Sequence, residues 1–529
     1  MRHLLPACAL LWGAAMSTPL MANEASVPAP GSLAQVRAPD GDGGKAADLV
    51  RPDDPRRASL KRPLLMAQGS RDALFGSGSD AEEKPKSSGS RDALFGSGAP
   101  SDEKPKSSGD RDALFGSGTA DERKPARISG FVEGLVAYNY ANPSHWSRAV
   151  GRAQLTAQGD LGNGVKWKLG GRADADLVYF NSDFYPRDVR HDQRADFFFG
   201  ENYLDFSAGP WEFRVGAQHI VWGEVVGLFF ADVVSARDMR EFLLPSFDVI
   251  RIPQWAARAE YFGENSHVEL IWIPVPVFDR IGKPGADFYP APLPSPVPAE
   301  VADLFRSPDR PARSLANSNY GIRANTLISG WDLSGFYYRS FSTQPTFYRE
   351  LTGDASRPFE FRPRYDRIWQ AGGTLSKDLG EMVLRGEVVY THGQGFSVAD
   401  LAAEQSVVRR ATFDYILGLE FSPRNDTRVN VQAFQRVYSG RHHDLAIQNG
   451  SAGASVFVST KLTDTLEPQL LWIQYFQDGG GLIRPRINWH AAANLTVSAG
   501  VDIFTGPSDG YFGRYDNRDR VYTEMRYSF

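Results

Sequence analysis

Charged side chains that alternate with apolar ones are the residues best placed to do chemistry in the second part of this chain. From residue 128 onward arginine far outnumbers lysine. Its planar guanidinium suits carboxylates, phosphates and sugar hydroxyls better than a flexible ammonium does. The candidate ladder of basic and acidic residues consists of Arg385, Glu387, Asp414, Glu420, Arg428, Arg436, Arg484, Arg486 and Asp502. Two roles are open for it: a basic ladder that lines the lumen and faces the carboxylates, or mutual neutralisation of the two signs.

Strands of about ten residues must position this ladder. Residues 412–421 show the pattern best, because Asp414 and Glu420 lie in one row and only Ile416 interrupts its polarity. The opposite, apolar row is Phe413, Tyr415, Leu417, Leu419 and Phe421. Residues 428–437 alternate in the same way, with Phe434 placed among the polar residues. Gly, Asp, Asn and Pro turns separate such segments from Ile128 to Phe529, which predicts about 16–18 strands.

A membrane barrel explains these strands better than a soluble sandwich, although both alternate in polarity. The strands are long and numerous, Trp and Tyr gather near their ends, and the polar row is dense in charge. Unpaired backbone groups are costly in hydrocarbon, so the sheet must close on itself. We therefore predict an all-β, transmembrane antiparallel β-barrel over residues 128–529, located in the bacterial outer membrane. With an even strand number, both of its ends face the periplasm.

The last strand carries a further signal. Residues 521–529 alternate through Met525 and Tyr527 to Phe529. This pattern resembles the terminal strand by which bacterial outer-membrane barrels are recognised for assembly, so the barrel assembly machinery is an expected partner.

Composition limits the remaining classes. The chain has 529 residues, a formal charge of −5 and one cysteine. There is no basic excess typical of a nucleic-acid binder. Residues 1–22 read as a signal peptide cleaved after Ala22, and Cys8 lies within its apolar core. The mature chain would then contain no cysteine, which excludes disulfides, thiolate metal sites and a cysteine nucleophile. We predict no cofactor.

Residues 23–127 are predicted to be a disordered periplasmic arm, because they contain too few apolar residues to form a core. An Arg-Asp-Ala-Leu-Phe-Gly unit recurs three times in it with a period of 20 residues. Its apolar anchors are Leu74, Phe75, Leu94, Phe95, Leu114 and Phe115. The repeats are either linear motifs that bind a periplasmic protein with increased effective concentration, or a spacer of no consequence.

The most specific motif lies between Trp211 and Trp272. A strand runs into a turn made of Trp222, Gly223 and Glu224. Residues 232–242 are then predicted to form a short helix, started by a capping box of Ser235 and Asp238. Inside a wide barrel, this helix would present a charged constriction made of Arg237, Asp238, Arg240 and Glu241. The alternative is that Glu224 pairs with a lumen arginine and stabilises the inserted loop.

This stretch resembles an uncharacterised proteobacterial outer-membrane family known as domain of unknown function 1302. The matching positions are Gly216, Gln218, Trp222, Gly223, Glu224, Asp238, Arg240 and Glu241, whereas Ala217 stands where the family's arginine usually lies. The C-terminal strands also resemble this family through Pro485-Arg486, Gly500, Phe512-Gly513 and Tyr527-Ser528-Phe529. The resemblance covers most of residues 128–529 and none of the arm. It implies transport at the outer membrane, often alongside lipid-handling or efflux-type export proteins.

Three classes of function are open. The first is a pore or conduit for a lipid, a hydrophobic compound or a polysaccharide, coupled through the arm to periplasmic or inner-membrane partners. The second is a docking barrel that anchors a periplasmic partner. The third is an outer-membrane hydrolase, for which the nine histidines provide no recognisable motif. The proline-rich residues 274–311 are expected to form an extracellular or lumen-folded loop.

Overall fold

The computed structural model describes residues 126–223, 231–291, 293, 297–398, 404–440, 451–477, 480–508 and 510–529. The predicted signal peptide and arm lie outside the described residues, and so does Glu224. The six leucine and phenylalanine anchors of the repeats lie outside them as well.

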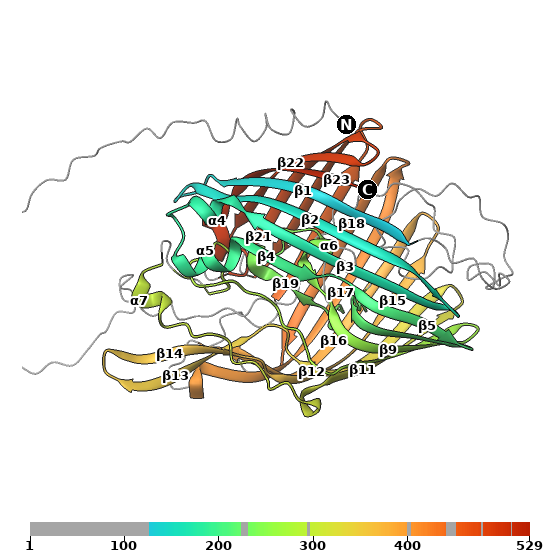
Figure 1. The fold of residues 1–529 in the computed structure, drawn as a ribbon, viewed down its shortest axis with the longest axis horizontal. Coiled ribbons are helices and arrows are strands. Elements are labelled where there is room, and N and C mark those ends of the chain that lie inside the picture. Colours follow the sequence, from blue (N-terminus) through green and yellow to red (C-terminus); the bar gives the residue numbers. More distant parts are fainter. Residues whose placement is uncertain are drawn as a thin grey trace, which may run out of the picture. The chain divides into compact units, whose positions relative to one another are not determined.

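Within the described residues, eighteen antiparallel strands form a closed barrel, which confirms the predicted fold (Figure 1). Each wall strand pairs with the next wall strand along the chain, except that β4 does not pair with β5, and β23 pairs with β1 to close the sheet. The wall strands are β1 (Arg127–Asn139), β2 (His145–Gly162), β3 (Val165–Asp176), β4 (Ala195–Phe199), β5 (Asn202–Ala208), β6 (Trp211–Gln218), β9 (Gln254–Phe262), β10 (Ser266–Ile273), β11 (Asn319–Ile328), β12 (Trp331–Phe341), β15 (Arg367–Asp378), β16 (Met382–Ser397), β17 (Val407–Arg424), β18 (Thr427–Tyr438), β19 (Ser451–Thr460), β20 (Leu466–Tyr475), β21 (Gly481–Ala492), β22 (Leu495–Thr505) and β23 (Arg520–Ser528). Both β4 and β5 pair with β3, so together they occupy one position in the wall.

The two ends of the barrel differ in loop length. At the end where β1 begins and β23 ends, the turns are short, as at Gly162–Gly164 and Ser329–Gly330. At the opposite end lie the long connections. They contain α4 (Leu177–Asn181), α5 (Arg187–Gln193), β7 (Ala236–Arg237), α6 (Phe247–Ile250), β8 (Arg251–Ile252), α7 (Ala299–Ala302) and the hairpin of β13 (Thr346–Asp354) and β14 (Arg357–Arg364). Outer-membrane barrels have short periplasmic turns and long extracellular loops. This assigns the short-turn end to the periplasm.

The alternation read from the sequence sorts the side chains between lipid and lumen. Leu417 is 54% exposed on the outside, whereas Asp414 of the same strand is 4% exposed on the inside. The same holds on β18, where Val431 faces outward and Gln432 is buried. Among the described residues, no helix is long and apolar enough to cross a bilayer.

The helix predicted over residues 232–242 is wrong. This stretch contains only the short strand β7 and a 3₁₀ turn, Met239–Glu241. The backbone N–H groups of Asp238 and Met239 donate to Ile250 and Arg280 instead of to their own turn. Because residues 232–242 are almost all buried against other parts of the chain, their backbone groups form tertiary hydrogen bonds in place of helical ones. Asp238 still acts as a cap, since its side chain accepts from the backbone N–H of Arg240.

Candidate functional site

A segment of the chain leaves the wall after β6 and returns to it at β9. We call its described part, residues 231–253, the inserted segment. Most of its residues are buried, including all but Asp238 from Ala231 to Leu244, and again Val249 and Ile250. Its neighbours are side chains on the inner face of the wall, so it lies inside the barrel.

Trp222 anchors the approach to this segment. The side chain is fully buried and donates from Nε1 to Oε2 of Glu269 on β10, at 3.0 Å. Its ring packs against Phe336 and Tyr338 of β12. Gly321 on β11 leaves the space for it, because a Cβ there would lie 2.7 Å from the indole. The Trp of the predicted turn is therefore held by three neighbouring strands.

Glu387 on β16 binds the beginning of the inserted segment. Its Oε2 accepts from the backbone N–H of Ala231 at 2.8 Å. Gly223 lies beside the same carboxylate, since a Cβ at this position would be 3.2 Å from Oε1. One candidate of the predicted ladder thus contacts the backbone of the inserted segment directly.

Glu241 attaches the middle of the inserted segment to the opposite side of the wall. Its carboxylate lies 3.4 Å from Arg148 Nε and 3.2 Å from Arg152 Nη2, both on β2, and 3.5 Å from Arg520 Nη1 on β23. Each of these arginines also pairs with a wall carboxylate: Asp176, Glu133 and Asp502 respectively. Burial by itself would raise the pKa of the Glu241 carboxyl, but the three guanidinium charges outweigh it and lower the pKa to about 2.

The other charged residues of the predicted constriction also have partners. Arg240 Nη2 lies 2.6 Å from Asp238 and 3.0 Å from Asp196 on β4. Burial alone would raise the pKa of Asp238, but Arg240 and Arg280 lower it overall. Arg237 is 2% exposed and donates from Nη2 to the carbonyl oxygen of Asp232 at 2.9 Å. The four residues therefore connect the segment to its surroundings through hydrogen bonds and ion pairs.

The rest of the predicted ladder falls into local groups on the wall. Arg436 pairs with Asp414 at 2.5 Å, and Glu420 lies 2.7 Å from Arg428 and 3.7 Å from Arg385. Arg484 and Asp502 pair at 2.6 Å, and Arg486 pairs with Glu524 at 3.1 Å. Arg484 also donates to the carbonyl oxygen of Leu244, which joins this part of the wall to the inserted segment.

An apolar cluster inside the barrel was missed by the sequence reasoning. Met239, Phe242, Leu243 and Leu244 of the inserted segment pack there against side chains of the wall and of the 506–519 loop. The wall contributes Ile416, Phe434, Leu471, Ile473, Tyr475, Leu482 and Phe504. Ile416 and Phe434 are the two residues that interrupt the polar rows of their strands. These apolar residues in otherwise polar rows were the signal in the sequence for an apolar cluster inside the barrel.

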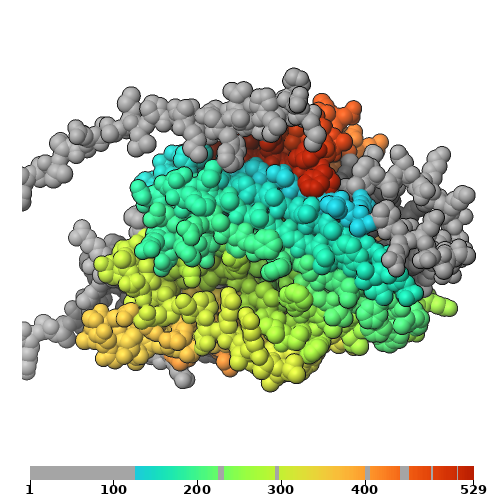
Figure 2. Space-filling view, in the orientation of Figure 1, coloured from blue at the N-terminus to red at the C-terminus, as the bar shows by residue number. Residues whose placement is uncertain are grey.

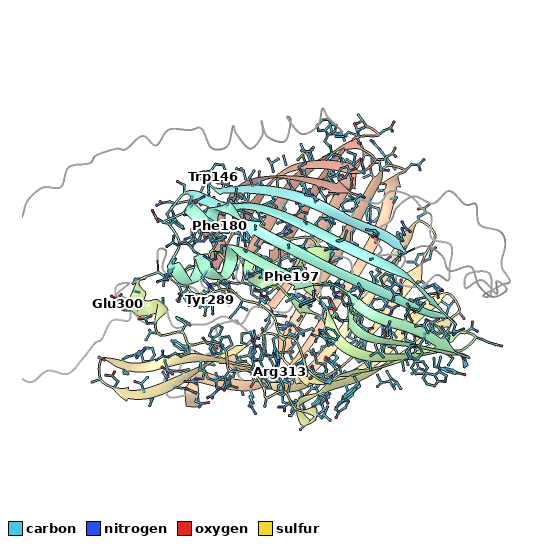
Figure 3. The ribbon with its side chains drawn as sticks, in the orientation of Figure 1. Trp146, Phe180, Phe197, Tyr289, Glu300 and Arg313 are labelled. Atoms are coloured by element: carbon cyan, nitrogen blue, oxygen red, sulfur yellow. The ribbon has the colours of Figure 1, made fainter. Side chains whose placement is uncertain are left out.

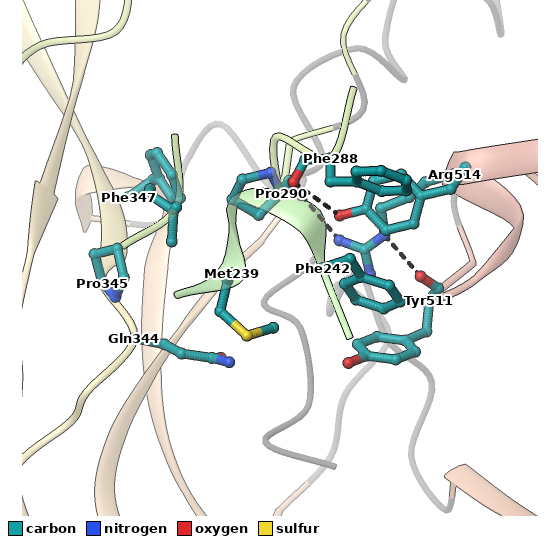
Figure 4. Close-up of a pocket in the computed structure, with 11 residues that line it drawn as sticks. Met239, Phe242, Phe288, Pro290, Gln344, Pro345, Phe347, Tyr511 and Arg514 are labelled. Carbon is teal, nitrogen blue, oxygen red and sulfur yellow. Dashed lines mark hydrogen bonds between the residues drawn. The ribbon is translucent and has the colours of Figure 1, made fainter. Parts of the chain in front are cut away.

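A pocket opens beside this cluster (Figure 4). It encloses about 40 Å³ and is lined mostly by aromatic and apolar side chains: Met239, Phe242, Ile281, Phe288, Pro290, Gln344, Pro345, Phe347, Tyr511, Arg514 and Tyr515. The Arg514 guanidinium lies over the Tyr511 and Tyr515 rings and donates to the carbonyl oxygens of Pro290 and Tyr511. The residues that line the pocket belong to the inserted segment and to long loops of the extracellular end, including the predicted proline-rich loop. In the described ranges, no group of three or more His, Cys, Asp or Glu residues has an arrangement suited to a metal ion.

Similar proteins are found among the solved structures. No curated protein matches the chain. Among solved structures, Salmonella typhi OmpF in complex with daunomycin is 9% identical, with 76% of this chain and 97% of that chain covered and a TM-score of 0.38. Pseudomonas aeruginosa OccK1 (OpdK) is 8% identical, with coverages of 76% and 98% and a TM-score of 0.43. Acinetobacter baumannii OccAB4 is 7% identical, with coverages of 77% and 99% and a TM-score of 0.46.

The closed, even-stranded antiparallel barrel with an apolar exterior is the architecture of bacterial outer-membrane proteins. The predicted location in the outer membrane is thereby confirmed. The family model that matches covers residues 136–529 and is described as "Protein of unknown function (DUF1302)". The chain belongs to this family.

Proposed function

We propose that this barrel is a conduit for apolar or amphipathic molecules, in which the inserted segment restricts the lumen. The observation that carries the proposal is the aromatic pocket beside the inserted segment. A water-filled pore for polar solutes needs a polar lumen, whereas this pocket joins Phe242, Phe288 and Phe347 from three separate loops. Binding sites for small apolar ligands are lined in this way, with few polar groups, but they enclose about 300–1,000 Å³. This pocket encloses about 40 Å³, so a ligand enters it only when the inserted segment or the surrounding loops shift. Of the substrate classes open from the sequence, the hydrophobic compound fits best.

The inserted segment supplies the restriction. It is fixed at Glu387 on β16 and at Arg148, Arg152 and Arg520 on β2 and β23, which lie on different parts of the wall. Passage past it requires these contacts to shift. The wild-type barrel should therefore show little steady ion conductance in a planar bilayer, with brief openings.

Binding of the fluorescent probe N-phenyl-1-naphthylamine to the purified full chain tests the pocket. The Phe347→Ser variant removes one ring from its lining and should weaken binding at least tenfold, since a buried aromatic side chain contributes about 1.5–3 kcal/mol. The matched control is Phe206→Ser, which removes a lipid-facing ring on β5. Unchanged binding in Phe347→Ser, or a large steady conductance without probe binding, would argue for a general porin instead.

A second candidate is the docking barrel, and the ion pairs that hold the inserted segment also favour it, because a closed lumen suffices for an anchor. In this case the arm binds a periplasmic protein through Leu74, Phe75 and their repeats. The assembly machinery would recognise β23, whose neighbour Phe529 exchanges backbone hydrogen bonds with Gly130 at the barrel seam. Absence of both conductance and probe binding would support this candidate.

A further inference from the structure

One wall strand has an edge without a partner strand. β5 pairs with β6 from Asn202–Ala217 to Ala208–Trp211. Beyond Gln218 the chain turns inward, and Ile220 and Trp222 are buried inside the barrel. β4 continues the wall beyond β5 and pairs with β3 on one side. In the described part of the chain, no strand pairs with its other side.

This free edge lies near the middle of the membrane. Trp146 marks the extracellular part of β2, and Trp167 of β3, paired with Gly159, marks the periplasmic part. Thirteen residues separate Trp146 from Gly159 along β2. At about 3.3 Å per residue and a tilt of about 45°, they span about 30 Å, the thickness of the hydrocarbon core. Phe197 of β4 is joined through Ala173 to Ala153, which lies about halfway between the two levels on β2. Two steps round a wall tilted by about 45° displace Phe197 from the level of Ala153 by about 7 Å along the axis, so it stays within the hydrocarbon core.

Other parts of the chain border the edge on its extracellular and periplasmic sides. On the extracellular side, Tyr185 donates to Asp287 at 2.6 Å, and a Cβ on Gly285 would lie 2.8 Å from Pro186. The 274–318 loop therefore packs against the α4–α5 connection. On the periplasmic side, the Asn202–Ala217 pair begins the continuous wall. Figure 3 shows Phe197 on this face, farther from the long-loop end than Trp146 and Phe180. In Figure 2 the surface is recessed between the blue-green strands and the yellow segments of this face.

The Asp196 side chain satisfies one backbone N–H of β4 and links this strand to the inserted segment and to Arg280. Asp196 accepts from the Phe197 backbone N–H at 2.9 Å and pairs with Arg240 at 3.0 Å and Arg280 at 2.5 Å. The Phe198 ring faces inward, where the guanidinium carbons of Arg172 and Arg280 lie 4.2 and 5.0 Å from its centre. On the outside, Phe197 and Phe199 are 60% and 69% exposed. An unpaired edge at membrane depth is tolerated only where it lines a cavity or is covered by protein.

Gln193, at the end of α5, adds an unsatisfied polar group to this place. Its side chain is only 6% exposed, and neither amide atom has a hydrogen-bond partner within the described residues. It lies beside Arg240, because a Cβ on Gly282 would be 3.7 Å from Nε2 of Gln193 and from Cγ of Arg240. A buried amide without partners carries the full desolvation penalty of its polar atoms. A neutral hydroxyl, which both donates and accepts, is the group that would satisfy both of its atoms.

We propose that the free edge of β4 borders a lateral opening, through which a membrane-dissolved molecule with an apolar body and one hydroxyl group moves between bilayer and lumen. The apolar body passes Phe197 and Phe199, and the hydroxyl binds the Gln193 amide. This inference rests on the proposed conduit function and adds both the route and the polar group of its substrate.

Lipid access to the inner side of β4 tests the opening. In a Cys8→Ser background, Phe198→Cys labelled with bimane should be quenched by doxyl-labelled lipids at least half as strongly as Phe197→Cys, which faces the bilayer. Ser455→Cys on β19, an inner position in a fully paired region, is the matched control and should be quenched less than one tenth as strongly. Quenching of Phe198→Cys as weak as that of Ser455→Cys would overturn the opening.

The hydroxyl preference is tested with pyrenebutanol and butylpyrene, which differ in that group alone. Wild type in liposomes should bind pyrenebutanol about tenfold more tightly, and Gln193→Leu should abolish the difference. Gln370→Leu, which changes a buried wall glutamine that donates to Thr391, should retain it. Equal binding of both probes by wild type would refute the assignment of Gln193. If binding of N-phenyl-1-naphthylamine still depended on Phe347, the conduit proposal would stand without this route.

Discussion

Glutamine at position 241 would remove the negative charge that three arginines share, while nearly preserving the size of the side chain. Each arginine nitrogen lies 3.2–3.5 Å from the carboxylate. At an effective dielectric constant of 20, one such pair contributes about 5 kcal/mol of Coulomb energy. Desolvation offsets most of this, and removal of one partner from a buried pair typically costs about 3–5 kcal/mol.

The lower end of this range applies to Glu241→Gln. Arg148, Arg152 and Arg520 keep Asp176, Glu133 and Asp502 as partners, so no guanidinium is left without a carboxylate. We expect a loss of about 3 kcal/mol in the attachment of the inserted segment to β2 and β23. At about 1.4 kcal/mol per factor of ten, the detached population rises about 150-fold.

Single-channel recording in planar bilayers measures this population as the fraction of time in open levels. Glu260→Gln is the matched control: this buried carboxylate pairs with Arg258 and His267, and all three residues belong to the wall strands β9 and β10. The control should leave the open fraction at the wild-type level. If Glu241→Gln folded normally and opened no more often than Glu260→Gln, the inserted segment would not be held by its ion pairs, and our account of the closed lumen would fail.

Further predictions concern packing and pH. Gly321→Ala should lower the thermal stability of the detergent-purified barrel by about 1–3 kcal/mol, because the new Cβ meets Trp222 and Tyr338 within 2.8 Å, whereas Gly335→Ala, with no atom closer than 3.9 Å, should not. Phe434→Ala should cost about 3–5 kcal/mol in thermal unfolding, and the lipid-facing Phe413→Ala much less, because acyl chains refill the space outside. Because the folded-state pKa of Glu241 is lowered from 4.5 to about 2, its charge stabilises the fold fully above pH 4.5 and progressively less toward pH 2. The stability difference between wild type and Glu241→Gln should therefore be constant from pH 5 to 8 and shrink below pH 4.5 in urea titrations.

The barrel could be predicted from the sequence because a period of two residues is a local property. The side of the wall that Phe413, Asp414 and Leu417 face follows from the residues next to them in the sequence. In the structure Phe413 and Leu417 face the lipid, and Asp414 faces the lumen. The ion pairs could not be predicted from local sequence. Glu241 contacts Arg148 and Arg152 on β2 and Arg520 on β23, which lie far from it and from each other in the sequence. The helix expected at 232–242 failed for a related reason: a capping pattern reports local preference, and the enclosed segment satisfies its backbone through Ile250 and Arg280.

The exceptions to the alternation carry the functional information in this fold. In a lumen filled with water, an inward Ile416 or Phe434 would expose apolar surface to water and would contribute no hydrophobic stabilisation. Both residues instead pack with Leu243, Leu244 and the aromatic residues that border the pocket. An apolar residue in a polar row of a barrel strand thus indicates that something apolar lies inside at this height. The same logic applies in reverse to Gln193, a polar residue enclosed without a partner among the described residues. Each kind of exception marks a side chain whose contacts come from something other than the barrel wall: the inserted segment for Ile416 and Phe434, and a bound hydroxyl group, in our proposal, for Gln193.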